Sequence, residues 1–210
     1  EITRGDARDG RVVGELVKGA DIVIPLAAYV GAPLCNEDPV GATTTNRDAQ
    51  FMLVDKLGKD QSLLVPITNS GYGVGVDGQF CTEETPMRPL SLYGKHKVEV
   101  EEKMLERENS LSFRLATVFG MAPRMRLDLL VNDFTYRAVN DRTVVLFESH
   151  FKRNYIHVRD VARAFLHGID NFGVMRGWPY NVGLSDANIS KLELCQKIQE
   201  HIPKFVFMEA

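Results

Sequence analysis

Short runs of apolar residues alternate with longer amphipathic stretches along the chain of 210 residues. Continuous apolar runs rich in branched side chains indicate strands, which we predict at residues 22–26, 63–67, 111–118, 144–147, 153–158, 179–183 and 205–210. Apolar positions near helical spacing predict helices at residues 10–18, 46–59, 93–105, 127–140, 160–170 and 191–201. Strands that alternate with helices of this length imply βαβ units and a mainly parallel sheet.

Three local signals refine these elements. The run at 22–26 is continuous and rich in β-branched residues, which is typical of a parallel strand buried on both faces of its sheet. Pro66 lies inside the strand at 63–67 and removes one donor from the ladder, which weakens that prediction. Ser190 precedes the last helix and Glu193 follows three residues later, which predicts a capping box.

Small and polar residues stand near the ends of three predicted strands. Ala27 and Ala28 follow the strand at 22–26, and Thr-Asn-Ser occupies residues 68–70 at the end of the next strand. Ligands of open parallel sheets bind outside the carboxyl ends of the strands. We therefore expect these positions to share one crevice with residues 116–117.

The composition argues against several classes of function. The chain is 44% hydrophobic and 25% charged, which suits one globular domain with a sizeable core. Its net charge of −3 offers no basic field for nucleic acid or an anionic membrane. No apolar stretch approaches the ~18 residues of a membrane span, and the first residues do not resemble a signal peptide. Cys35, Cys81 and Cys195 are far apart, so we expect no metal site, no disulfide framework and a cytoplasmic location.

Tyr93 and Lys97 form the strongest candidate for chemistry. Residues four apart on a helix stack on one face, so both side chains should point into the same space. A phenol titrates near ~10, and a nearby ammonium stabilises the phenolate and lowers that pKa. The pair could serve as a general acid and base. On spacing alone, an amphipathic Tyr beside a solvated Lys remains an open alternative.

Taken in order, these pieces resemble the extended short-chain dehydrogenase/reductase family, the nucleotide-sugar epimerases and dehydratases. Tyr93 and Lys97 match its Tyr-x-x-x-Lys motif, and Thr68 matches its catalytic Ser or Thr. Residues 153–160 resemble the Arg-x-Tyr-Ile-His-Val-x-Asp signature, whose Arg grips a diphosphate. Further matches lie at residues 5–9, 26–28, Asn46 and 114–120.

The resemblance implies an α/β fold, namely a Rossmann-like doubly wound parallel sheet with a small C-terminal substrate-binding lobe. We expect a dinucleotide-binding core at residues 1–120, and a mixed substrate-binding lobe with returning core strands at 121–210. The family's glycine-rich phosphate loop is absent from the chain, so we expect the family's N-terminal βαβ unit and C-terminal end to be missing from it. The chain as it stands should therefore bind the dinucleotide poorly. NAD is the expected cofactor, and NADP stays open because the discriminating segment lies in the missing part.

The resemblance also assigns roles to individual residues. The catalytic residues are Thr68, Tyr93 and Lys97. The cofactor-binding residues are Asp6, Ala7, Leu26, Ala27, Ala28, Tyr93, Lys97 and Leu115. The substrate-binding residues are Asn69, Ser70, Thr117, Leu129 and Arg153. Two departures from the family pattern are Thr117, in place of its usual Asn, and Pro25, in place of its usual His.

The residues after Thr68 help to choose among the reactions of the family. The 4,6-dehydratases carry an Asp-Glu pair there for the elimination of water, and this chain carries Asn69 and Ser70. An amide and a hydroxyl cannot replace two carboxylates, so we favour an NAD-dependent epimerase acting at C4 by transient oxidation of the sugar. An NADPH-dependent keto-sugar reductase, a 4,6-dehydratase and a catalytically silent dinucleotide-binding regulator are the alternatives.

The expected partner is a nucleotide-diphosphate sugar. Arg153 suits it because a guanidinium binds phosphate with two parallel hydrogen bonds, although a surface salt bridge is the alternative reading. Cys81 and His157 are expected to be structural rather than catalytic. The resemblance further implies a homodimer that pairs the helix at 46–59 and the Tyr93 helix with their copies.

Overall fold

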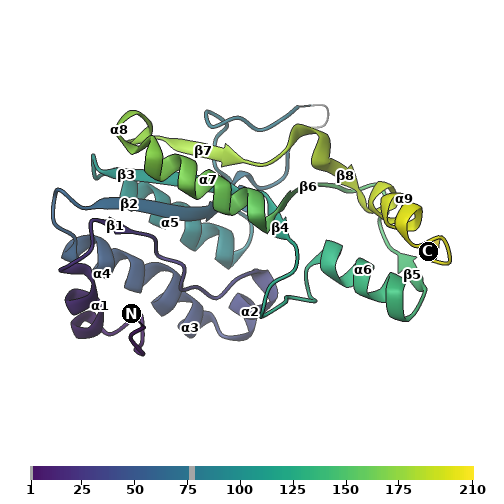
Figure 1. The fold of residues 1–210 in the computed structure, drawn as a ribbon, viewed down its shortest axis with the longest axis horizontal. Coiled ribbons are helices and arrows are strands. Elements are labelled where there is room, and N and C mark those ends of the chain that lie inside the picture. The colour runs from purple at the N-terminus through teal and green to yellow at the C-terminus, as the bar shows by residue number, and fades with distance from the viewer. Residues whose placement is uncertain (1, 76–78) are drawn as a thin grey trace. The chain divides into compact units, whose positions relative to one another are not determined.

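The computed structural model describes residues 2–75 and 79–210 (Figure 1). Its helices are α1 (Gly10–Val17), α2 (Ala32–Glu37), α3 (Pro39–Thr43), α4 (Ala49–Lys56), α5 (Leu92–Leu105), α6 (Leu130–Asn140), α7 (Val158–Asp170), α8 (Phe172–Met175) and α9 (Lys191–His201). Its strands are β1 (Ile22–Val23), β2 (Ser62–Thr68), β3 (Ser110–Leu115), β4 (Thr117–Phe119), β5 (Thr143–Leu146), β6 (Lys152–His157), β7 (Pro179–Val182), β8 (Asn188–Ser190) and β9 (Val206–Glu209). Short helical turns are the π-turn Thr44–Asp48 and the 3₁₀ turns Asn69–Tyr72 and Ser185–Ala187.

Two compact units make up the chain. The first unit comprises Glu1–Leu115 and Phe165–Asn181, and the second comprises Ala116–Ala164 and Val182–Ala210. The sequence predicts a different division, into a cofactor-binding part at 1–120 and a substrate-binding part at 121–210. That functional division stays a prediction.

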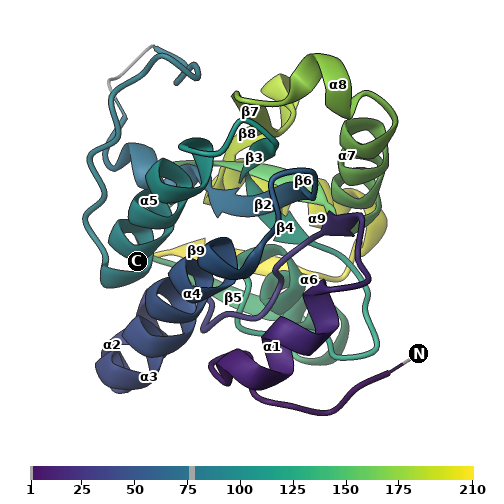
Figure 2. The same cartoon turned by 90° about the vertical axis from the view of Figure 1, so that its left-hand side faces the viewer.

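A parallel sheet in the order β1-β2-β3-β7 forms the centre of the first unit. Strand β2 pairs in parallel with β1 from Ile22↔Ser62 and with β3 from Leu63↔Ser110 to Thr68↔Leu115. Helices α4 and α5 follow one face of this sheet, as both views show (Figures 1 and 2). The strands and helices alternate as the apolar pattern predicts, and the fold class is α/β.

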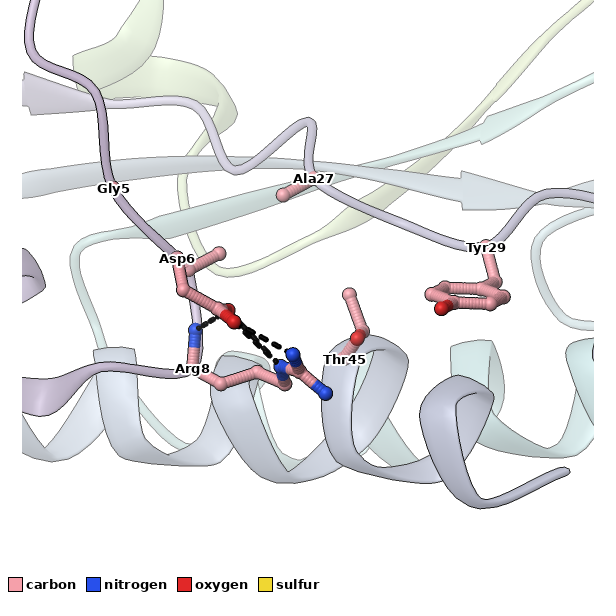
Figure 3. Close-up of a pocket in the computed structure, with 7 residues that line it drawn as sticks. Gly5, Asp6, Arg8, Ala27, Tyr29 and Thr45 are labelled. Atoms are coloured by element: carbon pink, nitrogen blue, oxygen red, sulfur yellow. Dashed lines mark hydrogen bonds and ion pairs between the residues drawn. The ribbon is translucent and has the colours of Figure 1, made fainter. Parts of the chain in front are cut away.

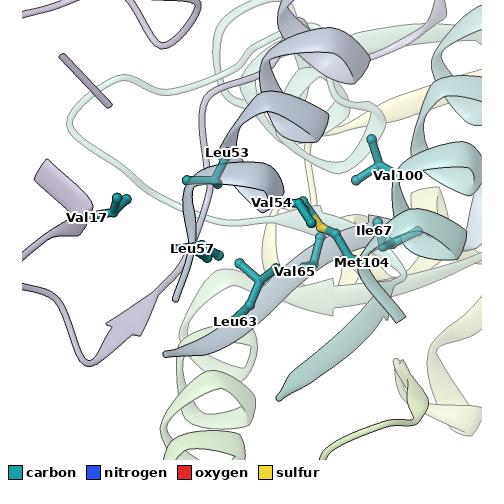
Figure 4. Close-up of a cluster of buried hydrophobic side chains, with 9 residues drawn as sticks. All are labelled: Val17, Leu53, Val54, Leu57, Leu63, Val65, Ile67, Val100 and Met104. Carbon is teal, nitrogen blue, oxygen red and sulfur yellow. The ribbon is translucent and has the colours of Figure 1, made fainter. Parts of the chain in front are cut away.

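Apolar residues from β2 and three helices form the core on the α4 and α5 side of the sheet. Figure 4 shows them converging on one face of β2. Its fully buried members include Leu63, Val100 and Met104. The whole cluster is Val17, Leu53, Val54, Leu57, Leu63, Val65, Ile67, Val100 and Met104. Burial of each large side chain in it contributes roughly 1.5–3 kcal/mol, so this cluster fixes α5 against β2.

The C-terminal half of α7 covers the other face of β3. The ring of Phe165 meets that of Phe113 edge-on, with ring centres 4.9 Å apart. A Cβ at Gly168 would lie 2.7 Å from Phe113 and 3.0 Å from Leu111. Only a glycine therefore lets this part of α7 approach the strand so closely.

The strand predicted at 22–26 is shorter and more exposed than expected. Strand β1 ends at Val23, and Leu26 is 70% exposed, so the expectation of burial on both faces is wrong. If the β1–β2 register continued, the next donors across the ladder would be the nitrogens of Pro25 and Pro66. Neither proline has an N–H, so the ladder stops where β1 ends.

Pro66 is nevertheless part of a well-formed strand. The amide of Ser62 donates to Asp21 O, whereas the amide of Leu63 donates to Asn109 O. The backbone N–H and C=O groups of even-numbered β2 residues thus face β1. Pro66 is even-numbered and lies beyond the end of β1, so its lack of an N–H costs no ladder hydrogen bond. The β2–β3 ladder is therefore intact through Pro66↔Phe113.

The helix predicted at 46–59 begins earlier and contains an irregular turn. Helix α3 starts at Pro39 with Asp38 as its N-cap, and the π-turn joins it to α4, which ends at Lys56. The carboxylate of Asp38 accepts from the amide of Gly41 at 2.8 Å. The Asp-Pro pair is a helix start signal, and the prediction failed to extend the helix back to it.

The strand predicted at 111–118 is two strands in two sheets. Strand β3 ends at Leu115 and belongs to the four-stranded sheet, whereas β4 begins at Thr117 and pairs with β6. The apolar pattern runs through Ala116 without a break, so it does not reveal the change of partner. The helix predicted from residue 160 begins at Val158, directly after β6, and the one predicted from 127 begins at Leu130.

The second unit contains the sheets β4-β6-β8 and β5-β9. Strand β6 pairs in parallel with β4 and antiparallel with β8, and β5 pairs in parallel with β9. Its core is Phe134, Ala138, Val144, Leu146, Tyr155, Leu194, Cys195, Ile198 and Phe205. The capping box at the start of α9 is confirmed, because Ser190 and Glu193 each accept from the other's backbone amide, at 3.1 and 2.7 Å. Among the described residues, no helix is long and apolar enough to cross a membrane.

Candidate active site

The first turns of α5 lie against the carboxyl end of β2. Ser91 caps the helix by accepting from the Gly94 amide at 3.0 Å. A Cβ at Gly94 would lie 3.4 Å from the Ser70 carbonyl oxygen, so the helix approaches the end of β2 closely. One turn later, Lys97 Nζ donates to the Pro66 carbonyl at 2.9 Å. These contacts bring the half-buried Tyr93 and the buried Lys97 to the strand end that carries Thr68.

Lys97 is an ammonium group enclosed by protein. Its side chain is 6% exposed, and burial lowers its pKa to about 8, against a weaker opposing effect of the nearby Cys35 sulfur. An ordinary lysine stays charged well above that pH. Lys97 can therefore exchange its proton near the physiological range.

Thr68 and Ser70 form a pair of hydroxyls at the end of β2. Thr68 Oγ1 donates to Ser70 Oγ at 3.0 Å and accepts from the Ser70 amide at 3.2 Å. A hydroxyl has one donor and two acceptor sites, so Thr68 keeps one acceptor site for a ligand. Ser70 is exposed and Asn69 is half-buried beside it.

A hollow of about 500 Å³ opens in the first unit beside residues that the sequence assigns to the cofactor. It is lined by Gly5, Asp6, Ala7, Arg8, Ala27, Tyr29 and Thr45 (Figure 3). Three of the predicted cofactor residues, Asp6, Ala7 and Ala27, are among them. Leu26 and Ala28 flank Ala27 without lining the hollow, and Leu115 ends β3.

Arg8 and Asp6 form an ion pair inside this hollow, as Figure 3 shows. Arg8 Nη2 and Nε donate to the carboxylate of Asp6 at 2.6 and 3.0 Å, and the Arg8 amide donates at 2.9 Å. These hydrogen bonds lower the pKa of Asp6 to about 2. Arg8, Tyr29 and Thr45 were missed by the sequence analysis, and the position of Arg8 two residues after Asp6 was the available signal for the first of them.

Arg114 belongs to a buried hydrogen-bonded network in the first unit. Its guanidinium binds the carboxylate of Glu101 through Nη2 and Nε at 2.6 and 2.9 Å, and Ser112 donates to the same carboxylate. Arg114 Nη1 also donates to Tyr72 Oη and to the Glu83 carbonyl, both at 2.9 Å. The resemblance places the stretch that begins at Arg114 against the ligands, and this side chain is committed to the protein interior.

Asn181 joins that network to the segment before α5. Its side-chain oxygen accepts from Tyr72 Oη at 2.7 Å, and its backbone N–H donates to the Glu83 carboxylate at 2.6 Å. Its side chain also donates to the Cys81 carbonyl at 3.3 Å. The Glu83 carboxylate and the Cys81 carbonyl are thus held in place, and the structural role expected of Cys81 stays a prediction.

The remaining predicted substrate residues belong to the second unit. Thr117 lies half-buried in β4, Leu129 precedes the first turn of α6, and Arg153 is exposed on β6. Asn132 holds the turn between β4 and α6, because it accepts from the Gly120 amide at 3.1 Å and donates to the Arg126 carbonyl at 3.0 Å.

His157 also has a structural environment in the second unit. Its Nδ1 accepts from the Arg159 amide at 3.2 Å, and its ring meets Phe119 edge-on. A Cβ at Gly120 would lie 2.7 Å from its Nε2. Within residues 2–75 and 79–210, no group of three or more His, Cys, Asp or Glu side chains could hold a metal ion.

Comparison with known proteins places this geometry in context. The model of the NAD dependent epimerase/dehydratase family matches residues 1–183. The low-salt glycan biosynthesis protein Agl12 of Haloferax volcanii is 30% identical over 207 residues, which cover 94% of this chain and 64% of the relative. This chain thus spans less than two thirds of the length of that curated relative.

Solved structures share the fold at low sequence identity. The UDP-glucose 4-epimerase of Thermus thermophilus, in complex with NAD, has a TM-score of 0.83 and 23% identity over 99% of this chain and 70% of its own. RMD of Pseudomonas aeruginosa, complexed with NADPH, has a TM-score of 0.87 and 18% identity over 99% of this chain and 76% of its own. The dTDP-glucose 4,6-dehydratase of Bacillus anthracis, in complex with NAD, has a TM-score of 0.82 and 18% identity over 99% and 67%. The predicted Rossmann-like α/β fold is confirmed.

Proposed function

Because this chain belongs to the NAD-dependent epimerase/dehydratase family, we propose that it acts on a nucleotide-diphosphate sugar through Thr68, Tyr93 and Lys97. The observation that carries the proposal is the junction of α5 with β2. There the Lys97 ammonium binds the Pro66 carbonyl, two residues before Thr68. This contact and the close approach of Gly94 to Ser70 support a shared site for the three side chains.

The hollow fits one end of the dinucleotide. It offers a carboxylate, a guanidinium, a hydroxyl and an aromatic ring around the small side chain of Ala27. The proposed cofactor residues are Asp6, Ala7, Leu26, Ala27, Ala28, Tyr93, Lys97 and Leu115. When bound, NAD supplies the site with an acceptor for a hydride from the sugar carbon, and gives that hydride back.

The protein's own groups handle the proton and the orientation of the sugar. Tyr93, as a phenolate, takes the proton of a sugar hydroxyl, and Lys97 stabilises the phenolate by its charge. Thr68 orients the same hydroxyl by donating a hydrogen bond to its oxygen, for which the Thr68 hydroxyl rotates away from Ser70 Oγ. With a pKa of about 8, Lys97 still carries its charge at pH 7, as this role requires.

An epimerase acting at C4 agrees with the side chains beside Thr68. Asn69 and Ser70 provide no carboxylate for eliminating water, and Ser70 already accepts the proton of Thr68. Epimerisation needs no further acid. The keto sugar rotates within the site and receives the hydride back on its opposite face. Thr117, Leu129 and Arg153 are proposed to bind the substrate, with the exposed guanidinium of Arg153 on the diphosphate.

A homodimer in the cytoplasm completes the proposal. Its interface would pair α4 and α5 with their copies. Velocity sedimentation at micromolar concentration should give a dimer, and a monomer would contradict this part of the proposal.

Product analysis with Tyr93→Phe tests the reaction itself. The full-length protein is incubated with a panel of UDP-, dTDP- and GDP-sugars, and the stereochemistry of the products is read by NMR. We expect interconversion of C4 epimers, with a rate reduced at least about a hundredfold in Tyr93→Phe, because general acid–base catalysis contributes about that much. Tyr136→Phe is the matched control, since Tyr136 is a half-exposed phenol on α6. Loss of water, net consumption of NADPH, or an unchanged rate in Tyr93→Phe would contradict the proposal.

A further inference from the structure

The segment that forms one wall of the hollow lies outside any strand. Strand β1 ends at Val23, and Ala27 and Tyr29 follow it in extended chain without a ladder partner on β2. Both residues line the hollow. A wall built from unpaired backbone needs another source of order, because each free residue costs ~1–2 kcal/mol of conformational entropy to fix.

Asn46 supplies that order through its side-chain amide. The Tyr29 amide donates to Asn46 Oδ1 at 2.7 Å, and Asn46 Nδ2 donates to the Tyr29 carbonyl at 2.8 Å. An Asn side chain carries the donor and the acceptor of a peptide group. It therefore pairs with both backbone groups of Tyr29 in the way that a neighbouring strand would.

Two further side chains hold the same wall. Cys35 Sγ donates to the Tyr29 carbonyl at 3.3 Å, and Asn46 Nδ2 also contacts this sulfur at 3.6 Å. Gln50 Nε2 donates to the Ala27 carbonyl at 3.3 Å. Each hollow-lining residue of the wall is thus held by its backbone from the helical segment that contains Asn46 and Gln50.

The π-turn explains why the side chains of the neighbouring residues Thr45 and Asn46 point in different directions. Thr45 lines the hollow, whereas Asn46 is 1% exposed and points into the protein. Both lie in the π-turn Thr44–Asp48, where one extra residue per turn changes the direction of the side chains. Such turns occur often at functional sites.

We propose that Asn46 is a positioning residue of the dinucleotide site. It holds the Tyr29 peptide, and through it the wall of the hollow, without itself touching the cofactor. This role rests on the proposed function, because it presumes that the hollow receives a part of NAD. It concerns binding of the cofactor and is independent of the sugar and of the reaction.

Titration of the full-length protein with NAD, followed by calorimetry, tests this role. We expect Asn46→Ala to weaken the affinity about tenfold, because the Tyr29 amide loses its acceptor and the Tyr29 carbonyl keeps only the weak thiol donor of Cys35. Gln61→Ala is the matched control. Gln61 is another side-chain amide of the first unit that binds backbone carbonyls, those of Val17 and Ala20 at 2.6 and 2.5 Å, and it does not line the hollow.

Gln61→Ala should lower stability towards urea but change the NAD affinity less than about twofold, since it leaves the hollow intact. Equal losses of affinity in Asn46→Ala and Gln61→Ala would overturn the positioning role. So would unchanged affinity in Asn46→Ala. An unaltered protein that binds no NAD would instead refute the proposed function.

Hydrogen exchange at the Tyr29 amide gives a second readout that needs no cofactor. Asn46→Ala should speed this exchange at least about tenfold, since the amide loses its acceptor. Asn46→Ser, which is too short to bind both groups of Tyr29, serves if Asn46→Ala does not fold. It should exchange faster than the unaltered protein and bind NAD more weakly, and unchanged exchange would overturn the proposal.

Discussion

Lys97 donates to a carbonyl near the end of β2, that of Pro66, which the β1–β2 ladder leaves without a backbone donor. Continued in the same register, β1 would reach the Pro66 carbonyl with a backbone amide, but β1 has ended at Val23. The Lys97 ammonium takes that place at 2.9 Å. The ammonium of Lys97, a candidate catalytic group, is thus held by a backbone carbonyl that is free because β1 is short.

Replacing Lys97 by Met should stabilise the protein at neutral pH. The pKa of Lys97 falls from 10.5 to about 8 in the folded state, so at pH 7 the fold carries a buried charge. A shift of that size corresponds to about 3 kcal/mol, which is an upper bound for the gain in the free energy of unfolding. Between pH 8 and 10.5 the unfolded state holds more protons, so the unaltered protein gains stability as pH rises and the advantage of Lys97→Met shrinks. Urea unfolding at pH 7 and pH 10 measures both effects.

Lys95→Met is the control for that prediction, because Lys95 is exposed on the same helix. It should change the free energy of unfolding by less than about 0.5 kcal/mol at either pH. If Lys97→Met is less stable than the unaltered protein at pH 7, the bond to Pro66 outweighs the burial of charge.

His96 should make the protein less stable in acid. Its Nε2 lies 3.2 Å from Thr43 Oγ1, and that hydroxyl donates to the Pro39 carbonyl, so Nε2 carries the proton. Its buried Nδ1 finds no partner among the described residues. Burial lowers the pKa of His96 below 6.5, and the charge of Arg47 adds to this, whereas nearby Glu99 and Asp48 oppose it.

The sign follows from proton counting. Below pH 6.5 His96 is protonated in the unfolded chain but still neutral in the folded one. The free energy of unfolding therefore falls as the pH decreases toward the pKa of His96 in the folded state. His96→Gln should flatten the pH dependence of the free energy of unfolding between pH 7.5 and 5, as measured with urea. His150→Gln, at an exposed histidine, should leave the slope as it is, and equal slopes in all three proteins would refute the prediction.

Removing only one partner of the Glu101–Arg114 ion pair should strongly lower the free energy of unfolding. Both side chains are buried, at 4% and 7% exposure. Arg114→Met leaves a buried carboxylate and should cost about 3–5 kcal/mol of stability, whereas the double variant with Glu101→Leu should cost less than the sum of the single ones. A double-mutant cycle in urea measures this coupling. The exposed pair Glu15–Lys18 is the control, with an expected coupling below about 1 kcal/mol, and similar couplings for both pairs would contradict the prediction.

Gly168→Ala should destabilise the first unit although alanine favours helices. Its Cβ would lie 2.7 Å from Phe113, so strand and helix must separate, at about 1–3 kcal/mol against the ~1 kcal/mol gained in helix propensity. Gly173→Ala is the matched control, because no atom lies within 4 Å of its Cβ position in α8. Thermal unfolding should show a lower midpoint for Gly168→Ala and an unchanged or higher one for Gly173→Ala. The reverse order would show that α7 has room to shift.

The sequence predicted well wherever the signal is local. The capping box of Ser190 and Glu193 needs only residues three apart, and the placement of Tyr93 and Lys97 on one helix needs only residues four apart. Both are found in the structure. The parallel sheet followed from the alternation of apolar runs with helices.

Features that depend on distant partners were not predictable in this way. An apolar run cannot tell whether its strand changes sheets, as the chain does at Ala116, and it cannot tell an edge strand from a central one. The partner of Arg114 is Glu101 because α5 packs on β3, which no spacing in the sequence reveals. The ion pair of Arg8 with Asp6 is local and could have been anticipated.

The two prolines at the end of the β1–β2 ladder also bear on strand pairing between chains. A strand edge with free N–H and C=O groups is a template for pairing with another chain. At Pro66 the amide donor is absent and the carbonyl is bound by Lys97, and Pro25 offers no donor either. Pro66 therefore offers a foreign strand neither a free donor nor a free acceptor. Replacing Pro66 by valine would restore a backbone donor on this side of β2 and remove part of that protection.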